Sequence, residues 1–299
     1  MKFGKILDKK ELQQIDFSLP KTIISPELSA KLKNSKSTFK IFVAGPAWGV
    51  KEWVGKIYPP KTRSADYLKS YSEAFNCIEL NSLHYRLQEP KTIISWREES
   101  ATDFTFCPKV SQSISHYGKL TDKIEVDHYF DVVSNFGEKL GIIFMQLSEN
   151  FSPNCIGDLK KFLEIYPKEF KLAIELRHEA WFWDKSVFKL FEEYGISSVI
   201  TDVGGRRDVL HMNITADEVV IRFVGNNLDE SDYTRIDLWI ERLKDYKEMG
   251  IKKVYFFIHE PDDVMCPEMA SYFIDKVNES SLDSIKPMKF YEEEQQSLL

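Results

Sequence analysis

The chain has 299 residues, of which 43% are hydrophobic and 29% are charged, and its formal net charge is −7. These values are typical of a globular chain with a large apolar core, so extensive disorder is excluded, and the acidic balance counts against a broad surface that tracks nucleic-acid phosphates. Four cysteines lie far apart without a C-x-x-C pair, which argues against a zinc knuckle and against a dense disulfide framework. The chain shows no signal-peptide h-region and no apolar run of membrane length, so a cytoplasmic protein is predicted.

Residues 1–39 are predicted to form an N-terminal extension of irregular chain, because Pro20 and Pro26 interrupt it. Residues 1–40 contain nine lysines against four acidic residues. Such a basic segment suits an anionic partner, and a solvated, partly mobile tail is the simpler alternative.

From residue 40 onward, eight runs rich in β-branched or aromatic residues alternate with segments of helical periodicity. The predicted strands span residues 40–45, 75–80, 103–110, 141–147, 171–176, 197–202, 219–224 and 254–259. Helical periodicity is present in every crossover with one exception, residues 204–218 between the sixth and seventh strands. The pattern predicts an α/β fold, a single (β/α)8 TIM barrel over residues 40–299, with an open doubly wound sheet as the alternative.

Polar residues recur at the carboxyl ends of these strands. In the fifth strand, a period of two turns Ile174 and Leu176 toward the helices and Glu175 and Arg177 inward. The same alternation in the second, third and seventh strands, together with the polar residues that end the fourth, sixth and eighth, places nine polar side chains at one rim: Glu79, Asn81, Lys109, Gln146, Glu175, Arg177, Asp202, Arg222 and His259. Active sites of TIM barrels lie at this end, so we expect a binding site there; structural ion pairs such as Glu175 with Arg222 are the alternative for some of these residues.

The residue types limit the chemistry of the predicted site. Lys109, Arg177 and Arg222 would form a cationic floor suited to phosphate or carboxylate. The catalytic candidates are Glu175, Asp202, Glu79 and His178, with the carboxylates as general acid and base. A divalent metal held by these carboxylates with His178 or His259 is the alternative, but three nearby cations would repel it, so no cofactor and no metal ligand is predicted.

Aromatic residues accompany this rim. Trp48, Tyr85, Tyr117 and Trp181 each follow a predicted strand, and aromatic rings stack on sugars and bases, although packing of loops explains any single one equally well. The predicted substrate-binding residues are Trp48, Asn81, Tyr85, Lys109, His116, Gln146, Arg177, Trp181, Arg222 and His259. The sequence contains no Walker A, G-x-G-x-x-G, G-x-S-x-G or H-E-x-x-H motif, which leaves nucleotide cofactors and a serine nucleophile without support.

Several stretches resemble, in order and spacing, the YecE-like family of TIM-barrel proteins of unknown function. They are GPAWGVKEWVGKIYP, IELNSLHYRL, FTFCPKVSQSISH, MQL, IELRHEAWF, VIRFVG and YTRIDLW. The resemblance implies a TIM barrel and brings no established reaction. The positions of this sequence that match the family's motifs are Glu79, Asn81, Tyr85, Lys109, His116, Glu175, Arg177, His178, Trp181, Asp202 and Arg222. Two departures lie at the proposed mouth: Val224 precedes Gly225 where the family tends to have histidine before glycine, and His259 and Glu260 replace paired asparagines.

These observations favour an enzyme that acts on an anionic substrate, either phosphorylated, sugar-like or a nucleic-acid strand, as a hydrolase, lyase or isomerase. A nucleic-acid-binding module and a non-catalytic barrel with a decayed site are the alternatives. The expected partner is therefore a small anionic molecule or a short nucleic acid, and no association with a membrane is expected.

Overall fold

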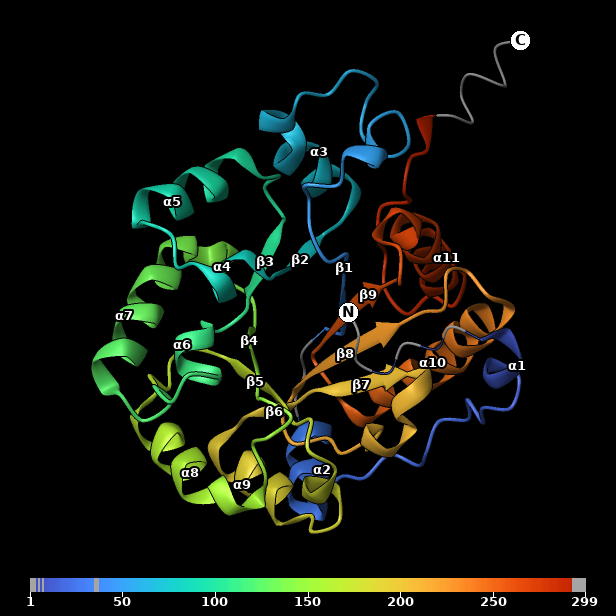
Figure 1. The fold of residues 1–299 in the computed structure, drawn as a ribbon. Helices are drawn as coiled ribbons and strands as arrows, with labels where there is room; N and C mark the ends of the chain where they lie inside the picture. Colours follow the sequence, from blue (N-terminus) through green and yellow to red (C-terminus); the bar gives the residue numbers. More distant parts are fainter. Residues whose placement is uncertain (1–3, 5, 7, 35–37, 292–299) are drawn as a thin grey trace.

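The computed structural model describes residues 4, 6, 8–34 and 38–291. It is an α/β structure in which parallel strands occupy the centre and helices surround them (Figure 1). The strands are β1 (Lys40–Ala44), β2 (Cys77–Leu80), β3 (Thr105–Pro108), β4 (Ile143–Gln146), β5 (Leu172–Glu175), β6 (Ser197–Ser198), β7 (Ile200–Val203), β8 (Glu218–Val224) and β9 (Lys253–His259). Because β6 and β7 divide one predicted strand, all eight predicted strands are confirmed, each with ends shifted by at most two residues.

The strands pair in parallel in three groups, with the orders β1-β9-β8-β7, β4-β5-β6 and β2-β3. Isolated parallel bridges from Phe106 to Leu140 and from Lys109 to Phe144 connect β3 to the β4 region. Between β1 and β2, the Asn76 side chain donates to the carbonyl of Ile41 at 2.9 Å and accepts from the amide of Val43 at 2.7 Å. Side-chain and isolated contacts therefore join the groups where regular ladders stop.

The strands bury two different faces, as their period of two requires. One face contributes to a large core shared with the helices. The other face forms a separate apolar cluster made of Phe42, Ala44, Cys77, Cys107, Ile142, Phe144, Ala173, Val199, Val220, Tyr255 and Phe257. We call the face that bears this cluster the inner face. The members of the cluster come from every strand region and none comes from a helix, so on this face the strands pack against one another.

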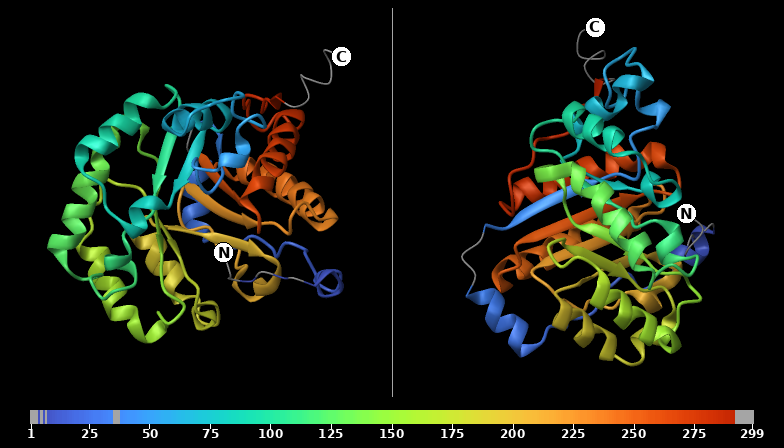
Figure 2. Two further views of the ribbon diagram at one scale, coloured as in Figure 1. Left: turned by 45° about the horizontal axis from the view of Figure 1, so that its top comes forward. Right: turned by 90° about the vertical axis from the view of Figure 1, so that its left-hand side faces the viewer.

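The helices that cover the outer face are α3 (Tyr67–Ala74), α5 (Pro90–Glu99), α7 (Lys123–Val133), α8 (Ile156–Ile165), α9 (Ser186–Tyr194), α10 (Glu230–Met249) and α11 (Cys266–Glu279). Figure 2 shows them around the strands in two further views. Each falls on a segment of predicted helical periodicity. The crossover from β7 to β8 has no α-helix, as predicted, and begins with the 3₁₀ segment Gly204–Val209.

The N-terminal extension packs along this helix-free crossover. Ile23 pairs with Asn213, the amide of Ile23 donates to the carbonyl of Met212, and Arg242 of α10 donates to the carbonyl of Pro20. The Phe17 ring lies 5.0 Å from the guanidinium carbon of Arg235. The extension therefore occupies the space that a crossover helix fills elsewhere.

Two short helices, α1 (Lys9–Leu12) and α2 (Pro26–Lys33), lie in the extension. The expectation that Pro26 marks irregular chain is wrong, because Pro26 is the first residue of α2 after the cap residue Ser25, a position where proline loses no helical hydrogen bond. Leu12, Leu28 and Leu32 are buried, so this part of the extension is packed and is not a solvated tail.

None of the helices in the described residues combines the length and the hydropathy that a membrane-spanning helix needs.

Candidate functional site

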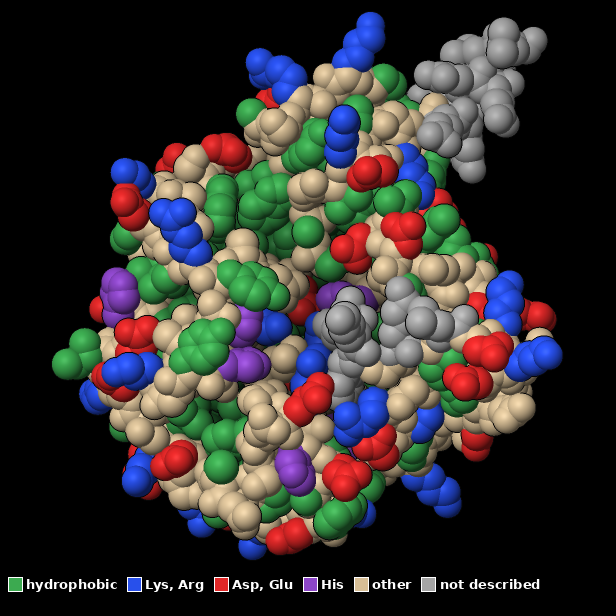
Figure 3. Space-filling model, viewed as in Figure 1, with side chains coloured by type: hydrophobic (Ala, Val, Ile, Leu, Met, Phe, Trp, Pro, Cys, Tyr) green, Lys and Arg blue, Asp and Glu red, His purple; other side chains and the backbone are tan. Residues whose placement is uncertain are grey.

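A cluster of buried polar side chains lies at the carboxyl ends of the strands, above the apolar inner face. Its members are Glu79, Lys109, Gln146, Glu175, Arg177, Thr201, Arg222 and His259. We call it the central charged cluster. Figure 3 shows histidine and basic side chains gathered near the middle of one face of the molecule.

Arg222 is at the centre of the cluster and is 0% exposed. Its Nη1 donates to Glu175 Oε2 at 3.0 Å, and its Nη2 donates to Glu79 Oε1 at 3.2 Å. The guanidinium carbon also lies 5.2 Å from the centroid of the Phe144 ring. One arginine therefore holds two carboxylates from β2 and β5, and the ion pair of Glu175 with Arg222, named above as the structural alternative for these residues, is present.

Glu175 is 1% exposed and uses both carboxylate oxygens. Its Oε1 accepts from Arg177 Nε at 3.1 Å and from Thr201 Oγ1 at 3.1 Å, in addition to Arg222. Burial raises the pKa of Glu175, but the neighbouring Arg177 and Arg222 charges outweigh it and hold the pKa below its ordinary value. Glu175 is therefore ionised and fully engaged, and it is not a poised proton donor.

Glu79 is also fully buried, and it pairs with a histidine. His259 Nε2 lies 2.6 Å from Glu79 Oε2 and 3.3 Å from Arg222 Nη2. Burial raises the pKa of Glu79, but Arg222 and His259 lower it further, so the carboxylate stays ionised. The pair of Glu79 and His259 therefore resembles the carboxylate–histidine arrangement that orients an imidazole for proton transfer.

Lys109 differs from the other cations of the cluster. Its Nζ donates to the neutral Gln146 Oε1 at 3.1 Å and lies 5.6 Å from the Phe144 ring centroid. Among the described residues it forms no ion pair with a carboxylate, whereas Arg177 and Arg222 each do. Burial and the adjacent Arg222 charge lower the pKa of Lys109 to about 8.

The cluster has more positive than negative charge. Three cations face two carboxylates, before any charge on His259. Lys109, Arg177 and His259 keep 6%, 8% and 7% of their surface exposed, whereas Glu79 and Arg222 keep none. The excess charge therefore lies on the side of the cluster that opens to solvent.

Two histidines border Lys109. The His84 ring, on α4 (Ser82–Tyr85), lies 5.2 Å from the His116 ring, and His84 Nδ1 lies 2.7 Å from the carbonyl oxygen of Val110. Burial lowers the pKa of His84 to about 4, and burial together with Lys109 and Arg177 lowers that of His116. Both imidazoles are therefore neutral at physiological pH.

The predicted aromatic residues lie in different settings. Tyr85 is 70% exposed, whereas Trp181 is 2% exposed and donates from Nε1 to the carbonyl of Phe151 at 2.6 Å. Trp48 is half-buried and packs edge-on against Trp96 at 5.1 Å. Trp181 and Trp48 therefore pack loops, while Tyr85 reaches solvent beside His84, whose ring is 5.0 Å away.

Two further predicted residues make local contacts. Asn81 Nδ2 donates to the carbonyl of Glu79 at 3.2 Å, which fixes the turn after β2. His178 accepts from the amide of Ala180 at 3.2 Å and caps the 3₁₀ segment Glu179–Phe182.

The predicted inward position of Asp202 is wrong. The register of β7 and β8 places Thr201 opposite Arg222 and Asp202 opposite Phe223, so Thr201 faces inward and Asp202 faces the helices. Asp202 Oδ2 accepts from Trp239 Nε1 at 2.8 Å, and Arg235 Nη2 lies 2.9 Å from Oδ1. Asp202 therefore anchors α10 to β7 and is separated from the central charged cluster.

This geometry bears on the metal alternative. Over the described part of the chain, no group of three or more His, Cys, Asp or Glu side chains is arranged to hold a metal ion. Asp202 points away, and both oxygens of Glu175 already accept from a guanidinium group.

The two family departures lie side by side. The amide of Gly225 donates to the carbonyl of His259 at 2.8 Å, and a side chain on Gly225 would collide with the Glu260 carboxylate, because an added Cβ would lie 2.2 Å from Oε1. Glu260 is 3% exposed and its Oε1 has no hydrogen-bond partner among the described residues. Burial and the neighbouring Asp232 raise the pKa of Glu260 to about 8.

Sequence reasoning missed Thr201 and His84. The available signal for Thr201 is the period of two from Val199, which lies on the inner face, because it places Thr201 on that face and Asp202 on the opposite one. No comparable signal marked His84, since its position depends on the short helix α4.

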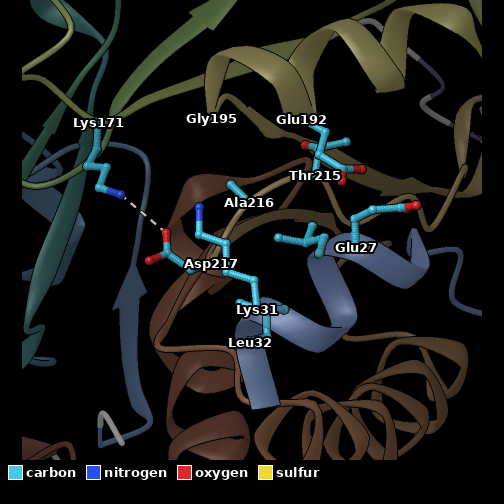
Figure 4. A pocket seen from close by; sticks show the side chains of 10 residues that line it. Glu27, Lys31, Leu32, Lys171, Glu192, Gly195, Thr215, Ala216 and Asp217 are labelled. Carbon is cyan, nitrogen blue, oxygen red and sulfur yellow. Dashed lines mark hydrogen bonds and ion pairs between the residues drawn. The ribbon is translucent and has the colours of Figure 1, made fainter. Parts of the chain in front are cut away.

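A cavity of about 240 Å³ lies at the opposite end of the strands. Figure 4 shows that α2 contributes Glu27 and Lys31 to it, facing Lys171 and Asp217, which are joined by an ion pair of 3.2 Å. Lys171 and Asp217 directly precede β5 and β8, so the cavity lies at the amino ends of these strands and is separate from the central charged cluster at their carboxyl ends.

Comparisons with known proteins place the chain in a family. A protein-family model described as "Protein of unknown function DUF72" matches residues 42–291 of this chain. The UPF0759 protein YecE of Escherichia coli strain K12 is 26% identical over 252 residues, which cover 77% of this chain and 89% of YecE.

Crystal structures of two DUF72 family proteins share the fold. The protein from Enterococcus faecalis V583 has a TM-score of 0.67 at 17% identity, covering 83% of this chain and 98% of that one. The protein from Thermotoga maritima MSB8 has a TM-score of 0.66 at 20% identity, covering 80% of this chain and 99% of that one. The chain therefore belongs to the DUF72 family, which includes YecE and has no known function.

Proposed function

We propose that the chain is an enzyme that binds a small anionic substrate at the central charged cluster and acts on it by acid/base catalysis. One observation carries the proposal: a buried lysine without a carboxylate partner among the described residues lies beside an arginine-rich cluster with excess positive charge. Burying uncompensated charge is costly, and an anionic ligand would supply the missing compensation.

The fold that supports this site is inferred to be a closed (β/α)8 barrel. The pairing order runs from β1 through β9, β8 and β7, and from β6 through β5 to β4. The bridges between β3 and β4 and the Asn76 side chain between β2 and β1 bring the two ends of that order together. In such a barrel the carboxyl ends of the strands form one mouth, where enzymes of this fold bind substrates.

The sequence pattern predicts the carboxylates as general acid and base, and the roles that we propose for Glu79 and Glu175 are different. Glu79 and Glu175 hold Arg222 and stay ionised, so they organise the site. Arg177 is at the more exposed edge and offers a planar guanidinium for a carboxylate or phosphate. Proton transfer falls to His259, which Glu79 orients, and to Lys109, whose pKa of about 8 lies close to neutral pH.

A short nucleic acid is the second candidate partner, and the exposed Tyr85 and Tyr117 side chains favour it, because each is 70% exposed and offers a face for stacking. The chain as a whole is acidic, with 47 Asp and Glu residues against 40 Lys and Arg residues, and the basic side chains of the site itself, Lys109, Arg177 and Arg222, are buried. A small anion therefore suits the site better than an extended phosphate backbone.

The experiment is calorimetric titration with inorganic phosphate and with a mixed-sequence single-stranded oligonucleotide at low salt. We expect phosphate to bind the parent protein and the Arg63→Gln control, since Arg63 is exposed and pairs with Asp66. Arg177→Gln should lower the affinity by about tenfold or more, because a charge-assisted hydrogen bond is lost. Equal affinity of Arg177→Gln and the parent protein, or binding of the oligonucleotide alone, would contradict the proposal.

A further inference from the structure

The chemical environment of Lys109 points to a more specific activity. Lysine is a nucleophile when its amine is neutral, and burial among other cations is the usual way in which proteins favour the neutral form. Lys109 is 6% exposed and lies near Arg222 and Arg177. The other charged or titratable groups that influence it or lie beside it are Glu79, Glu175, His84 and His116.

The contacts of Lys109 leave its amine available. Its single hydrogen bond to a described residue runs to the neutral amide oxygen of Gln146, which can accept from either an amine or an ammonium group. By contrast, the buried Lys139 donates to two carbonyl oxygens and one hydroxyl, those of Arg97 and Ser100. Lys139 therefore has all three donors engaged, whereas Lys109 has two that no described residue accepts.

We propose that Lys109 forms an imine with a carbonyl compound that also has a carboxylate or phosphate group, such as a 2-oxo acid or a phosphorylated ketone. This inference rests on the proposed function, since it assigns the substrate class of the same site. Arg177 would hold the anionic group while the Lys109 amine reaches the carbonyl carbon. The imine, once protonated, withdraws electrons from the adjacent carbon and so assists bond cleavage or proton removal there.

The step is balanced without any added oxidant or reductant. The lone pair of Lys109 Nζ forms a bond to the carbonyl carbon, and the carbonyl electron pair moves to oxygen, which takes up a proton. The resulting carbinolamine loses its hydroxyl group as water, assisted by a second proton, and the nitrogen loses the two protons it carried as an amine. The products are one imine and one water, and His116, neutral and close to Lys109, is placed to accept and return protons.

The test is reductive trapping of the full-length protein with pyruvate, glyoxylate or dihydroxyacetone phosphate and cyanoborohydride, followed by intact-mass measurement and peptide mapping. We expect one adduct per chain, located on Lys109, with phosphate slowing its formation. Lys139 serves as the internal control, because it is also buried but fully hydrogen-bonded. Arg177→Gln should slow trapping of pyruvate by about tenfold, as expected for loss of a charge-assisted contact to its carboxylate.

The outcomes separate the two proposals. Adducts that spread over surface lysines and omit Lys109 would overturn the imine inference, and if phosphate still binds, the anion site itself stands. Absence of both phosphate binding and trapping would overturn both. Because mapping is done on the parent protein, the result does not depend on whether Lys109→Met folds; where that variant does fold, it should lose the adduct.

Discussion

Glu175 shows how burial changes the expected role of a residue. If it lined a water-filled mouth, Glu175→Gln would keep its shape and leave stability nearly unchanged. Instead it is 1% exposed and accepts from Arg177, Thr201 and Arg222. We therefore expect Glu175→Gln to destabilise the fold by about 3–5 kcal/mol, because the buried ion pair with Arg177 and one of the two buried ion pairs of Arg222 are lost. Urea unfolding measures this, with the exposed Glu193→Gln as a matched control that should change little.

Glu260 should show the opposite behaviour. Its pKa is raised to about 8 by burial and by Asp232, so between its ordinary pKa and pH 8 the folded state holds more protons than the unfolded state. Stability from this group is therefore present at low pH and falls as the pH rises through that window. Glu260→Gln should remove this slope and stabilise the protein at pH 8 by about 1 kcal/mol or more. Unfolding measured from pH 5 to pH 8 tests it, and an unchanged slope would show that Glu260 is ionised throughout.

Among the elements, the N-terminal extension has the least expected role. It lies along the one crossover that lacks an α-helix, and α2 continues to the amino ends of the strands. Leu32 of α2 is 2% exposed, and its carbonyl oxygen lies against Gly250 at the end of α10. We expect Leu32→Ala to cost about 2–4 kcal/mol of unfolding free energy, as for a core leucine. The control is Ile124→Ala on α7, which is 83% exposed and should have almost no effect; equal effects would mean that α2 is only loosely attached.

The strands were predictable because period-two alternation carries both their location and their faces. Glu79, Lys109, Gln146, Glu175, Arg222 and His259 all lie in the central charged cluster as expected. The inward position predicted for Asp202 is wrong because the last polar residue of a strand need not face inward, and the register with β8 places Thr201 opposite Arg222. The packing of the extension was not predictable, because its contacts join residues far apart in the sequence, such as Ser25 with Glu192 and Pro20 with Arg242, which are 167 and 222 positions apart.

Across the whole molecule, charge is divided unevenly. The chain is acidic overall, yet the carboxyl ends of the strands hold a buried cluster with excess positive charge. Ion pairs of Arg222 join β8 to β2 and β5, and an ion pair of Arg235 joins α10 to β7, so the side chains around Arg222 already hold one another without a ligand. An anionic ligand would therefore meet a site that is already formed.

The titration of Lys109 measures this excess charge directly. Side-chain NMR of the lysine-labelled protein, with Lys109→Met to assign the signal, gives its pKa with and without phosphate. A pKa of about 8 is expected for the free protein, and phosphate should raise it by at least about one unit, because a bound anion stabilises the charged amine. A pKa of about 10.4, the ordinary value for lysine, that does not move when phosphate is added would contradict an anion-binding site at these strand ends.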